Sequence, residues 1–288
     1  MLKKDYNISD NYILLDSGNF QKLEQVGKYR LIRPALNALW PSALPEKEWN
    51  KATGIFTRNS SGGGRWQWKQ QPPVSWKISY GDYSLIAKPT DFGHLGFFPE
   101  QIDNWKWLTK ITSKTPQIQT LNLFAYSGGS TLAMAKGGAN VCHVDAAKGM
   151  VNWAKDNLSI NPQIPGNVRW IVDDVNKFIN RELKRNKTYP GIVLDPPSFG
   201  RGPNGQIWKI EQNLILLLKN LKKLMGNEPQ FMLLSMHSHG FSPNSLERIL
   251  MSIFNNKGTV NQEEMVIREK SGWKLSAGIS ARWQGEIL

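Results

Sequence analysis

The sequence predicts an α/β protein in which a small β-rich domain precedes a mainly parallel sheet flanked by helices. In residues 1–110, short apolar runs are broken by turn residues, as in a β-rich domain with a linker. In residues 111–288, apolar runs of strand length alternate with amphipathic stretches of helix length, which is typical of a parallel sheet covered on both faces. Hydrophobic residues make up 40% of the 288 residues, enough for a sizeable core. We therefore expect two domains, with a boundary near residue 110.

Four strands are predicted in the first domain, at residues 12–15, 29–32, 76–80 and 84–87. Seven of the twelve tryptophans lie before residue 110. We expect them to pack the interior of a domain that has few helices. The alternative is a base-stacking surface, since proteins that bind single strands place aromatic rings between basic residues.

Five strands and four helices are predicted in the second domain. The strands are expected at residues 121–124, 141–144, 168–172, 192–194 and 231–234. The helices are expected at residues 130–136, 148–159, 175–185 and 211–225. Each strand is followed by a helix or a turn, so the strand ends are the places to look for a site.

The composition limits the possible partners. The chain has 36 basic and 23 acidic residues, a net charge of +13, which favours an anionic partner such as nucleic acid. The single cysteine, Cys142, excludes an intrachain disulfide and a cysteine zinc cluster. The N-terminus lacks the apolar block of a signal peptide, and the aliphatic run Leu214–Leu218 is far too short to cross a membrane. We expect a soluble, cytoplasmic protein that contacts no membrane and binds no metal.

A glycine turn follows the first strand of the second domain. In Leu121–Thr131, Gly128 and Gly129 would let the backbone approach a ligand closely, and the next helix would offer unpaired N–H groups. The segment does not match G-x-G-x-x-G, and glycine turns after strands are common. Alone, it indicates a nucleotide site only weakly.

An aspartate follows the second strand of this domain. Asp145 lies 17 residues after Gly128, close to the spacing at which a carboxylate accepts the ribose hydroxyls of a bound nucleotide. The alternative is that Asp145 caps the next helix. Together with the glycine turn, this spacing favours a nucleotide-type cofactor.

The most specific motif is Asp195-Pro196-Pro197-Ser198-Phe199, directly after the strand at 192–194. Two prolines fix the backbone and remove two N–H donors, so that carbonyl oxygens can face a pocket. With the Asp195 carboxylate and the Phe199 ring, this element can hold a planar ring that carries an amine. The alternative is a rigid turn without a ligand. A nicotinamide dehydrogenase has no need for such an element.

From about Phe92 onward, the sequence resembles the class I S-adenosylmethionine-dependent methyltransferases, and in particular the group related to bacterial large-subunit ribosomal RNA methyltransferases. The matching segments are Gly96–Gln101, Asn122–Gly129, Val144-Asp145-Ala146, Asp173-Asp174-Val175 and Asp195–Phe199. The resemblance implies a Rossmann-like domain with a mainly parallel sheet of seven strands. It also implies S-adenosylmethionine as the cofactor and RNA, ribosomal RNA in particular, as the partner.

The resemblance also implies the role of individual residues. The cofactor-binding residues would be Phe98, Gln101, Phe124, Tyr126, Ser127, Gly128, Gly129, Asp145, Ala146, Asp173, Asp174 and Val175. Among them, Asp145 would hold the ribose. Asp174 would contact the adenine amine, and Asp173 is the less favoured choice for this role. The catalytic residues that face the acceptor would be Asp195, Pro196, Pro197 and Phe199. The larger ribosomal RNA enzymes of the group carry an additional N-terminal RNA-binding module, which we expect to be absent here.

Two observations bear on the acceptor. Methylation at carbon 5 of a pyrimidine normally needs a thiolate, and Cys142 lies inside a predicted strand, where a structural role is expected. We therefore expect transfer to a base nitrogen. The segment 200–209 is expected to form a mobile substrate loop in which Arg201 and Lys209 bind phosphate. His237 and His239 follow the strand at 231–234, and either could relay a proton or serve only the loop.

Three other functions stay open at this point. The chain could methylate a protein or a small molecule, because positive charge favours RNA without requiring it. It could be a non-catalytic RNA-binding factor with the same fold, in which case it would fail to bind the cofactor. A nicotinamide oxidoreductase is a more distant alternative.

Overall fold

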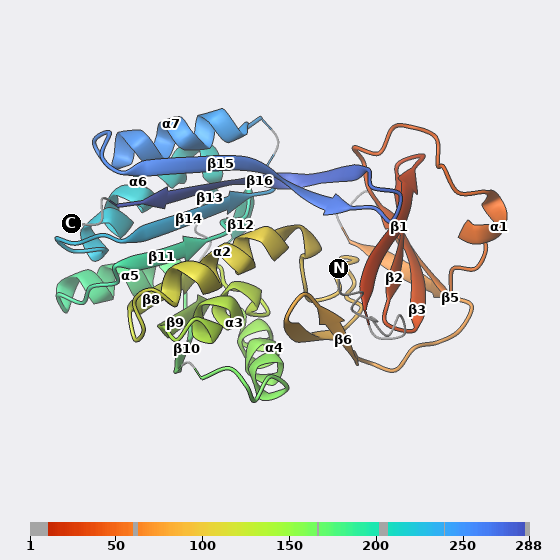
Figure 1. The fold of residues 1–288 in the computed structure, drawn as a ribbon, viewed down its shortest axis with the longest axis horizontal. Helices are drawn as coiled ribbons and strands as arrows, with labels where there is room; N and C mark the ends of the chain where they lie inside the picture. Colours follow the sequence, from red (N-terminus) through yellow and green to blue (C-terminus); the bar gives the residue numbers. More distant parts are fainter. Residues whose placement is uncertain (1–10, 60–62, 166, 202–206, 239, 286–288) are drawn as a thin grey trace, which may run out of the picture. The chain divides into compact units, whose positions relative to one another are not determined.

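The computed structural model describes residues 11–59, 63–165, 167–201, 207–238 and 240–285. The chain forms two compact units, and Figure 1 shows the course of each. The first unit comprises Met1–Ile102 together with Val266–Ser276, and the second comprises Asp103–Met265 together with Ala277–Leu288. A late segment of the chain therefore belongs to the first unit.

A mixed sheet of five strands forms the centre of the first unit, in the order β1-β2-β3-β4-β5. Its strands are β1 (Tyr12–Gly18), β2 (Gln21–Val26), β3 (Tyr29–Pro34), β4 (Gly54–Arg58) and β5 (Gly64–Trp68). A separate hairpin consists of β6 (Trp76–Tyr80) and β7 (Tyr83–Ala87). The described part of this unit also contains the short helix α1 (Glu46–Trp49) and the 3-10 helix η2 (Pro99–Gln101). All four strands predicted for this part of the chain are confirmed.

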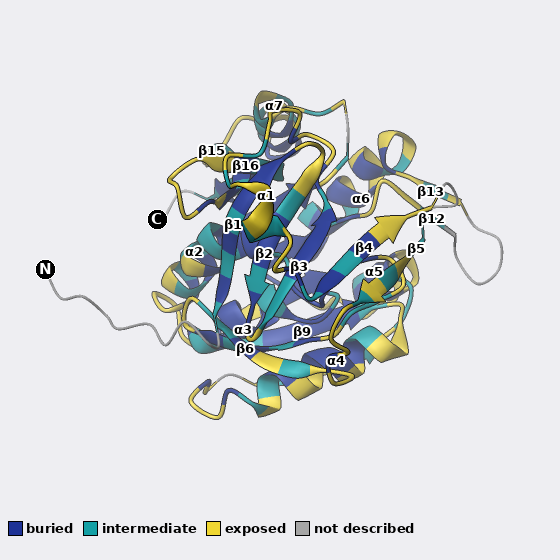
Figure 2. Ribbon diagram, turned by 90° about the vertical axis from the view of Figure 1, so that its right-hand side faces the viewer, coloured by how far each residue is buried: buried dark blue, intermediate teal, exposed yellow. Residues whose placement is uncertain are grey.

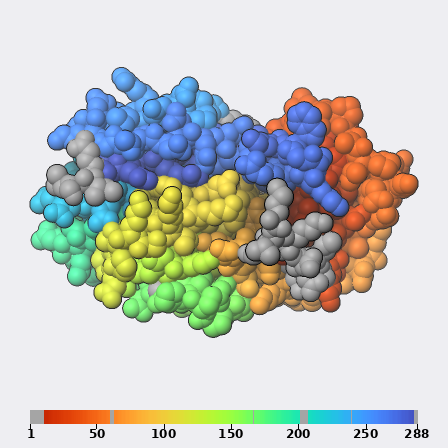
Figure 3. Space-filling model, viewed as in Figure 1, coloured from red at the N-terminus to blue at the C-terminus, as the bar shows by residue number. Residues whose placement is uncertain are grey.

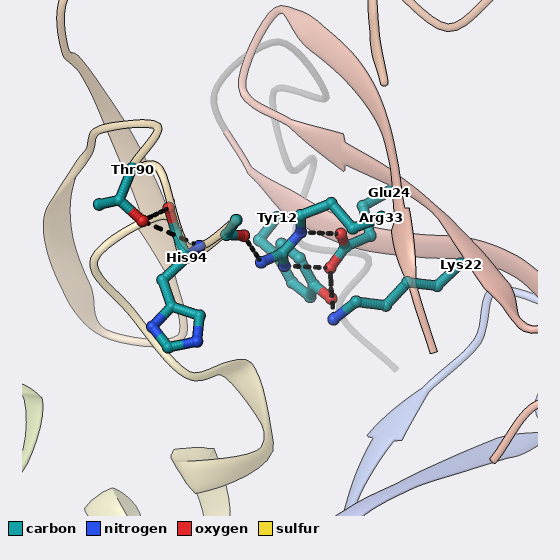
Figure 4. Close-up of polar contacts among 7 residues, drawn as sticks. Tyr12, Lys22, Glu24, Arg33, Thr90 and His94 are labelled. Atoms are coloured by element: carbon teal, nitrogen blue, oxygen red, sulfur yellow. Dashed lines mark hydrogen bonds and ion pairs between the residues drawn. The ribbon is translucent and has the colours of Figure 1, made fainter. Parts of the chain in front are cut away.

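A buried ion pair network lies inside the first unit (Figure 4). Arg33 donates from Nε to Glu24 Oε2 at 2.6 Å and from Nη2 to Glu24 Oε1 at 2.8 Å. Tyr12 Oη donates to Glu24 at 2.7 Å, and Lys22 Nζ lies 3.1 Å from the same carboxylate. Burial alone would raise the pKa of Glu24, but the charges of Arg33 and Lys22 and the hydrogen bonds from Arg33 and Tyr12 lower it to about 2. Arg33 also donates to the Gly93 carbonyl at 2.9 Å, which ties the segment before η2 to the sheet.

The second unit is built on a seven-stranded sheet in the order β10-β9-β8-β11-β14-β16-β15. The strands are β8 (Gln119–Leu123), β9 (Asn140–Asp145), β10 (Val168–Val172), β11 (Gly191–Leu194), β14 (Phe231–Met236), β15 (Thr259–Arg268) and β16 (Lys274–Gln284). The first five strands in this order are parallel, and β16 runs antiparallel to β14. The expected mainly parallel sheet of seven strands is confirmed.

Helices cover both faces of this sheet (Figure 1). On one face lie α2 (Ile102–Thr112), α3 (Gly129–Lys136) and α4 (Lys148–Ser159), and on the other lie α5 (Val175–Lys184), α6 (Ile210–Leu224) and α7 (Pro243–Ile253). The sheet is largely buried, whereas the outward faces of the helices are exposed (Figure 2). The outer side of α2 is part of the visible surface in Figure 3. An apolar core packs α5, α6 and α7 onto the sheet through side chains such as Phe178, Leu217 and Leu250.

Candidate functional site

The predicted motifs of the second unit gather at one edge of the sheet. Four of them follow the carboxyl ends of β8, β9, β10 and β11, which are neighbours in the sheet. His237 follows the end of β14, the next strand. In open α/β sheets, ligands bind in the crevice outside these strand ends. The topology therefore brings the predicted site residues of the second unit to the edge at which ligands bind in sheets of this kind.

The turn after β8 has a backbone that only a few residue types adopt readily. The φ angles are +54° at Phe124, +49° at Tyr126 and +88° at Gly128. A Cβ on Gly128 would lie 2.9 Å from the Cβ of Ala154 in α4, so glycine lets the turn pack directly on that helix. The helix α3 begins at the next residue, and its first backbone N–H groups lack partners within the helix.

Side-chain amides hold this turn in place. Asn157 in α4 donates from Nδ2 to the Ser127 carbonyl at 2.8 Å. Beneath the turn, Asn122 donates to Thr131 Oγ1 at 2.8 Å, and Thr131 Oγ1 lies 2.9 Å from His143 Nδ1. Burial lowers the pKa of His143 to about 3, so its ring is neutral and belongs to the core. The supporting roles of Asn157 and Thr131 were not predicted, because nothing in their local sequence distinguishes them.

Asp145 is held in a fixed orientation by the backbone. Its Oδ2 accepts from the Tyr126 N–H at 2.9 Å, and its Oδ1 accepts from the Ala147 N–H at 2.9 Å. Burial raises the pKa of Asp145, and the two hydrogen bonds oppose that rise. The residue that caps α4 is Ala147, without a side-chain hydrogen bond, so Asp145 does not act as the N-cap residue. Ala146 lies next to it and is exposed.

The two aspartates after β10 organise the start of α5. Asp174 is the N-cap residue, and its side chain accepts from the Lys177 N–H at 2.9 Å. Asp173 accepts from the Asp174 N–H at 2.9 Å and forms an ion pair with Arg181. Val175, at the first position of the helix, is buried. Both carboxylates therefore have a structural task, whether or not they also contact a cofactor.

The Asp195–Phe199 motif follows β11 and faces a histidine. The Asp195 Oδ2 lies 3.5 Å from His237 Nε2, while the other ring nitrogen, Nδ1, lies 2.8 Å from the Ala277 carbonyl. Because a carbonyl only accepts, Nδ1 carries a proton and Nε2 is turned toward the carboxylate. Pro196 is buried, whereas the Phe199 ring is half exposed. This places an acidic group, a histidine and an accessible aromatic ring at one strand end.

A small β-ribbon continues from this motif. β12 (Phe199–Arg201) pairs antiparallel with β13 (Ile207–Lys209), so the ends of the expected loop are strands. The residues between them, 202–206, and His239 lie outside the described residues. Lys209 is exposed, and Arg201 pairs through its backbone with Ile207.

Trp208 in this ribbon connects two of the motifs. It donates from Nε1 to the Pro197 carbonyl at 2.6 Å, and its ring centre lies 5.8 Å from that of Phe124. The ring thereby links the turn after β11 to the turn after β8. Sequence reasoning missed this role, because a tryptophan in a glycine-rich segment carries no signal of what it will contact.

Three predicted features lie elsewhere. Cys142 is buried in β9, and burial raises the pKa of its thiol to about 11, so it is a structural cysteine. Phe98 and Gln101 belong to the first unit, where Phe98 contacts the ring of His94 and Gln101 is buried in η2.

Among the described residues, no group of histidine, cysteine or acidic side chains is arranged to hold a metal ion. Within the same ranges, no helix has the length and apolar character needed to cross a membrane.

Comparisons with known proteins agree with this arrangement. Residues 94–240, about half of the chain, match the model of an S-adenosylmethionine-dependent methyltransferase family. A crystal structure of an S-adenosylmethionine-dependent methyltransferase from Agrobacterium tumefaciens is 36% identical and superposes with a TM-score of 0.89, covering 96% of this chain and 91% of that one.

Curated relatives match over shorter stretches. The ribosomal RNA large subunit methyltransferase K/L of Vibrio cholerae is 30% identical over 161 residues, which are 55% of this chain and 22% of that protein. The ribosomal RNA large subunit methyltransferase I of Aeromonas salmonicida is 35% identical over 109 residues, which are 37% of this chain and 27% of that protein. The matched stretches thus span about a quarter of these curated relatives or less.

Proposed function

Because this chain belongs to the S-adenosylmethionine-dependent methyltransferase family, we propose that it transfers the methyl group to RNA, and specifically to a base nitrogen of ribosomal RNA. The names of the curated relatives and the net charge of +13 support an RNA substrate. The observation that carries the proposal is the strand end at Asp195, where a half-exposed Phe199 ring follows two prolines in a rigid turn.

The residues at the edge of the sheet fit the cofactor. S-adenosylmethionine supplies a methyl group on a positively charged sulfur. Each oxygen of Asp145 accepts one backbone N–H and keeps lone-pair capacity, so the carboxylate can also accept two ribose hydroxyls. We assign the methionine end to Phe124, Ser127 and Gly128, and the adenine amine to Asp174 in preference to Asp173. The other cofactor residues implied by the resemblance are Phe98, Gln101, Tyr126, Gly129, Ala146 and Val175.

The acceptor base is proposed to stack on Phe199, with its amine or ring N–H donating to Asp195 and to the Pro196 carbonyl. These acceptors aim the nitrogen lone pair at the methyl group, and positioning of this kind is the main task of the protein in an in-line displacement. After transfer the nitrogen loses a proton, and His237 beside Asp195 is placed to take it. Pro197 contributes by fixing the turn, since its carbonyl is anchored by Trp208.

A nitrogen is favoured over carbon 5 of a pyrimidine because the carbon reaction needs a thiolate. The only cysteine of the chain is Cys142, and burial raises its pKa to about 11. Its side chain belongs to the core between the sheet and α5. No thiolate is therefore placed to add to a base.

The test is methylation of RNA from cells that lack this protein, followed by digestion to nucleosides and mass spectrometry. We expect one N-methylated nucleoside, and a loss of turnover of about 100-fold in Phe199→Ala with cofactor affinity retained. Charge reversal at Arg201 and Lys209 is expected to weaken the dependence of turnover on salt, because fewer phosphate contacts release fewer ions. A carbon-methylated nucleoside would refute the nitrogen assignment, and unchanged salt dependence would count against RNA.

A further inference from the structure

A groove of about 640 Å³ runs between α6 and α7 and belongs to none of the motifs described above. Its lining residues are Ile215, Leu216, Lys219, Asn220, Lys222, Lys223, Arg248, Ile249, Ser252, Ile253 and Asn255. α6 begins directly after β13, beside the proposed acceptor site, and ends before β14 starts at the opposite edge of the sheet. The lining residues lie in the middle and end of both helices, so the groove is separate from that site.

Aliphatic side chains at helical spacing line the groove. Leu216 is 62% exposed and Ile215 is 44% exposed, so two large aliphatic side chains lie next to each other on the surface of α6. On the facing helix, Ile249 and Ile253 recur with a spacing of four and complete the apolar lining. The lined part of α6, from Ile215 to Lys223, is about 12 Å long, which matches about two turns of an added helix.

All the charged side chains that line the groove are basic. Its charged side chains are Lys219, Lys222, Lys223 and Arg248, and the lining contains no acidic residue. Lys222 donates to the Ile253 carbonyl at 2.6 Å. The other three cations make no ion pair with any acidic side chain in the described part of the chain.

We propose that this groove binds an acidic amphipathic helix of another protein, with leucine-type side chains over Ile215, Leu216 and Ile249, and carboxylates paired with Lys219, Lys223 and Arg248. Charge complementarity selects an acidic partner. It disfavours a second copy of this chain, since each copy carries +13. RNA is disfavoured because the lining has no aromatic ring on which a base could stack, and exposed aliphatic side chains gain nothing from phosphate.

The first test uses a fluorescent helical peptide of about 14 residues, in which leucines follow one another at alternating spacings of three and four residues and the other positions are glutamate. Its control has the same composition with the leucines spread around the helix. The full chain is expected to bind the patterned peptide at least about tenfold more tightly than the control peptide, and more weakly as salt rises. Equal binding of both peptides would overturn the proposal.

Variants then locate the binding. The double reversal Lys219→Glu with Arg248→Glu, and separately Leu216→Ser, are each expected to weaken peptide binding by about tenfold or more. The matched control is Lys177→Glu with Lys184→Glu, two exposed lysines on α5, which is expected to leave peptide affinity within about twofold. Displacement of the peptide by a short oligouridylate, with the same losses in the groove variants, would assign the groove to RNA instead.

A photoreactive amino acid at position 216 gives an independent readout in cells. The cross-linked segment is expected to have net negative charge and aliphatic residues at helical spacing. Cross-linking to RNA, or to a basic or irregular protein segment, would contradict the proposal. Cross-linking that is no stronger from position 216 than from position 184 would contradict it as well. Because Leu216 is 62% exposed, this replacement leaves the core intact.

Discussion

Replacement of Asp145 by alanine tests the cofactor site most sharply. The carboxylate accepts two backbone N–H groups at 2.9 Å and is proposed to accept two ribose hydroxyls as well. Hydrogen bonds to a charged group contribute roughly 1.5–3 kcal/mol each, and this site is partly open to solvent. We therefore expect Asp145→Ala to lose about 2–4 kcal/mol of cofactor binding, a rise in Kd of about 30- to 1,000-fold.

The same substitution has a smaller effect on folding. Ala147 is exposed, so its N–H can bond to water instead, whereas Tyr126 is only partly exposed. The expected loss of unfolding free energy is about 1 kcal/mol, measured by urea unfolding. Asp156→Ala on α4 removes an exposed carboxylate near the site and serves as the control.

Calorimetric titration of wild type and Asp145→Ala with S-adenosylhomocysteine, which lacks the charge on sulfur, measures the difference in Kd that the Asp145 carboxylate makes. Since burial raises the pKa of Asp145, and the ionised form is the acceptor, cofactor affinity is expected to fall on acidification at a higher pH than for an exposed aspartate. A Kd for Asp145→Ala within about threefold of wild type, with folding retained, would refute this assignment.

Three further predictions concern stability and the acceptor. The pKa of Glu24 is about 2, so the contribution of its carboxylate to stability is complete above about pH 4.5 and is lost as the pH falls toward 2. Glu24→Gln breaks the ion pair with Arg33. In urea unfolding, this substitution is expected to cost about 3 kcal/mol at neutral pH and much less near pH 3. Gly128→Ala meets Ala154 at a φ of +88° and is expected to cost about 2 kcal/mol of stability. Because Ala154→Gly alone also costs about 1 kcal/mol inside α4, the contact is measured by a double-mutant cycle in thermal unfolding. The coupling energy is expected to be smaller than the whole cost of Gly128→Ala, and a coupling energy equal to that cost would show that the backbone angle is unstrained. Cys142→Ser is expected to keep methyl transfer within about threefold and to lose about 1 kcal/mol of stability; abolished transfer with retained cofactor binding would instead point to a thiolate mechanism.

The sequence predicted the parallel part of the sheet well, because its inner strands β8, β9, β11 and β14 are largely buried and contain short apolar runs. β10 was placed with its observed bounds, Val168–Val172. The last two strands were missed because the first part of β15 alternates exposed and partly buried residues, with polar residues at 261–264, and its apolar run at 265–267 is only three residues long. α7 was missed although its Ser242 begins a capping box and Pro243 occupies the first turn, both of which are recognisable helix-start signals.

The candidate site was predictable where a strand end carries its own chemistry, as at Asp145 and Asp195. What remained hidden were contacts between segments distant in the sequence. Trp208 reaches the Pro197 carbonyl and the Phe124 ring, and His237 reaches Asp195 only because β14 lies beside β11. Such pairs depend on strand order and on the path of a ribbon, which local patterns do not encode.

The central claim is that RNA is the methyl acceptor. The most direct measurement is transfer of a radiolabelled methyl group from S-adenosylmethionine into an extract of cells that lack this protein, with the product divided by sensitivity to nuclease and to protease. Our account predicts that the label is removed by nuclease and is not removed by protease. It also predicts that the Phe199→Ala variant no longer introduces the label. Label that only protease removes, or no label from an enzyme that still binds the cofactor, would contradict it.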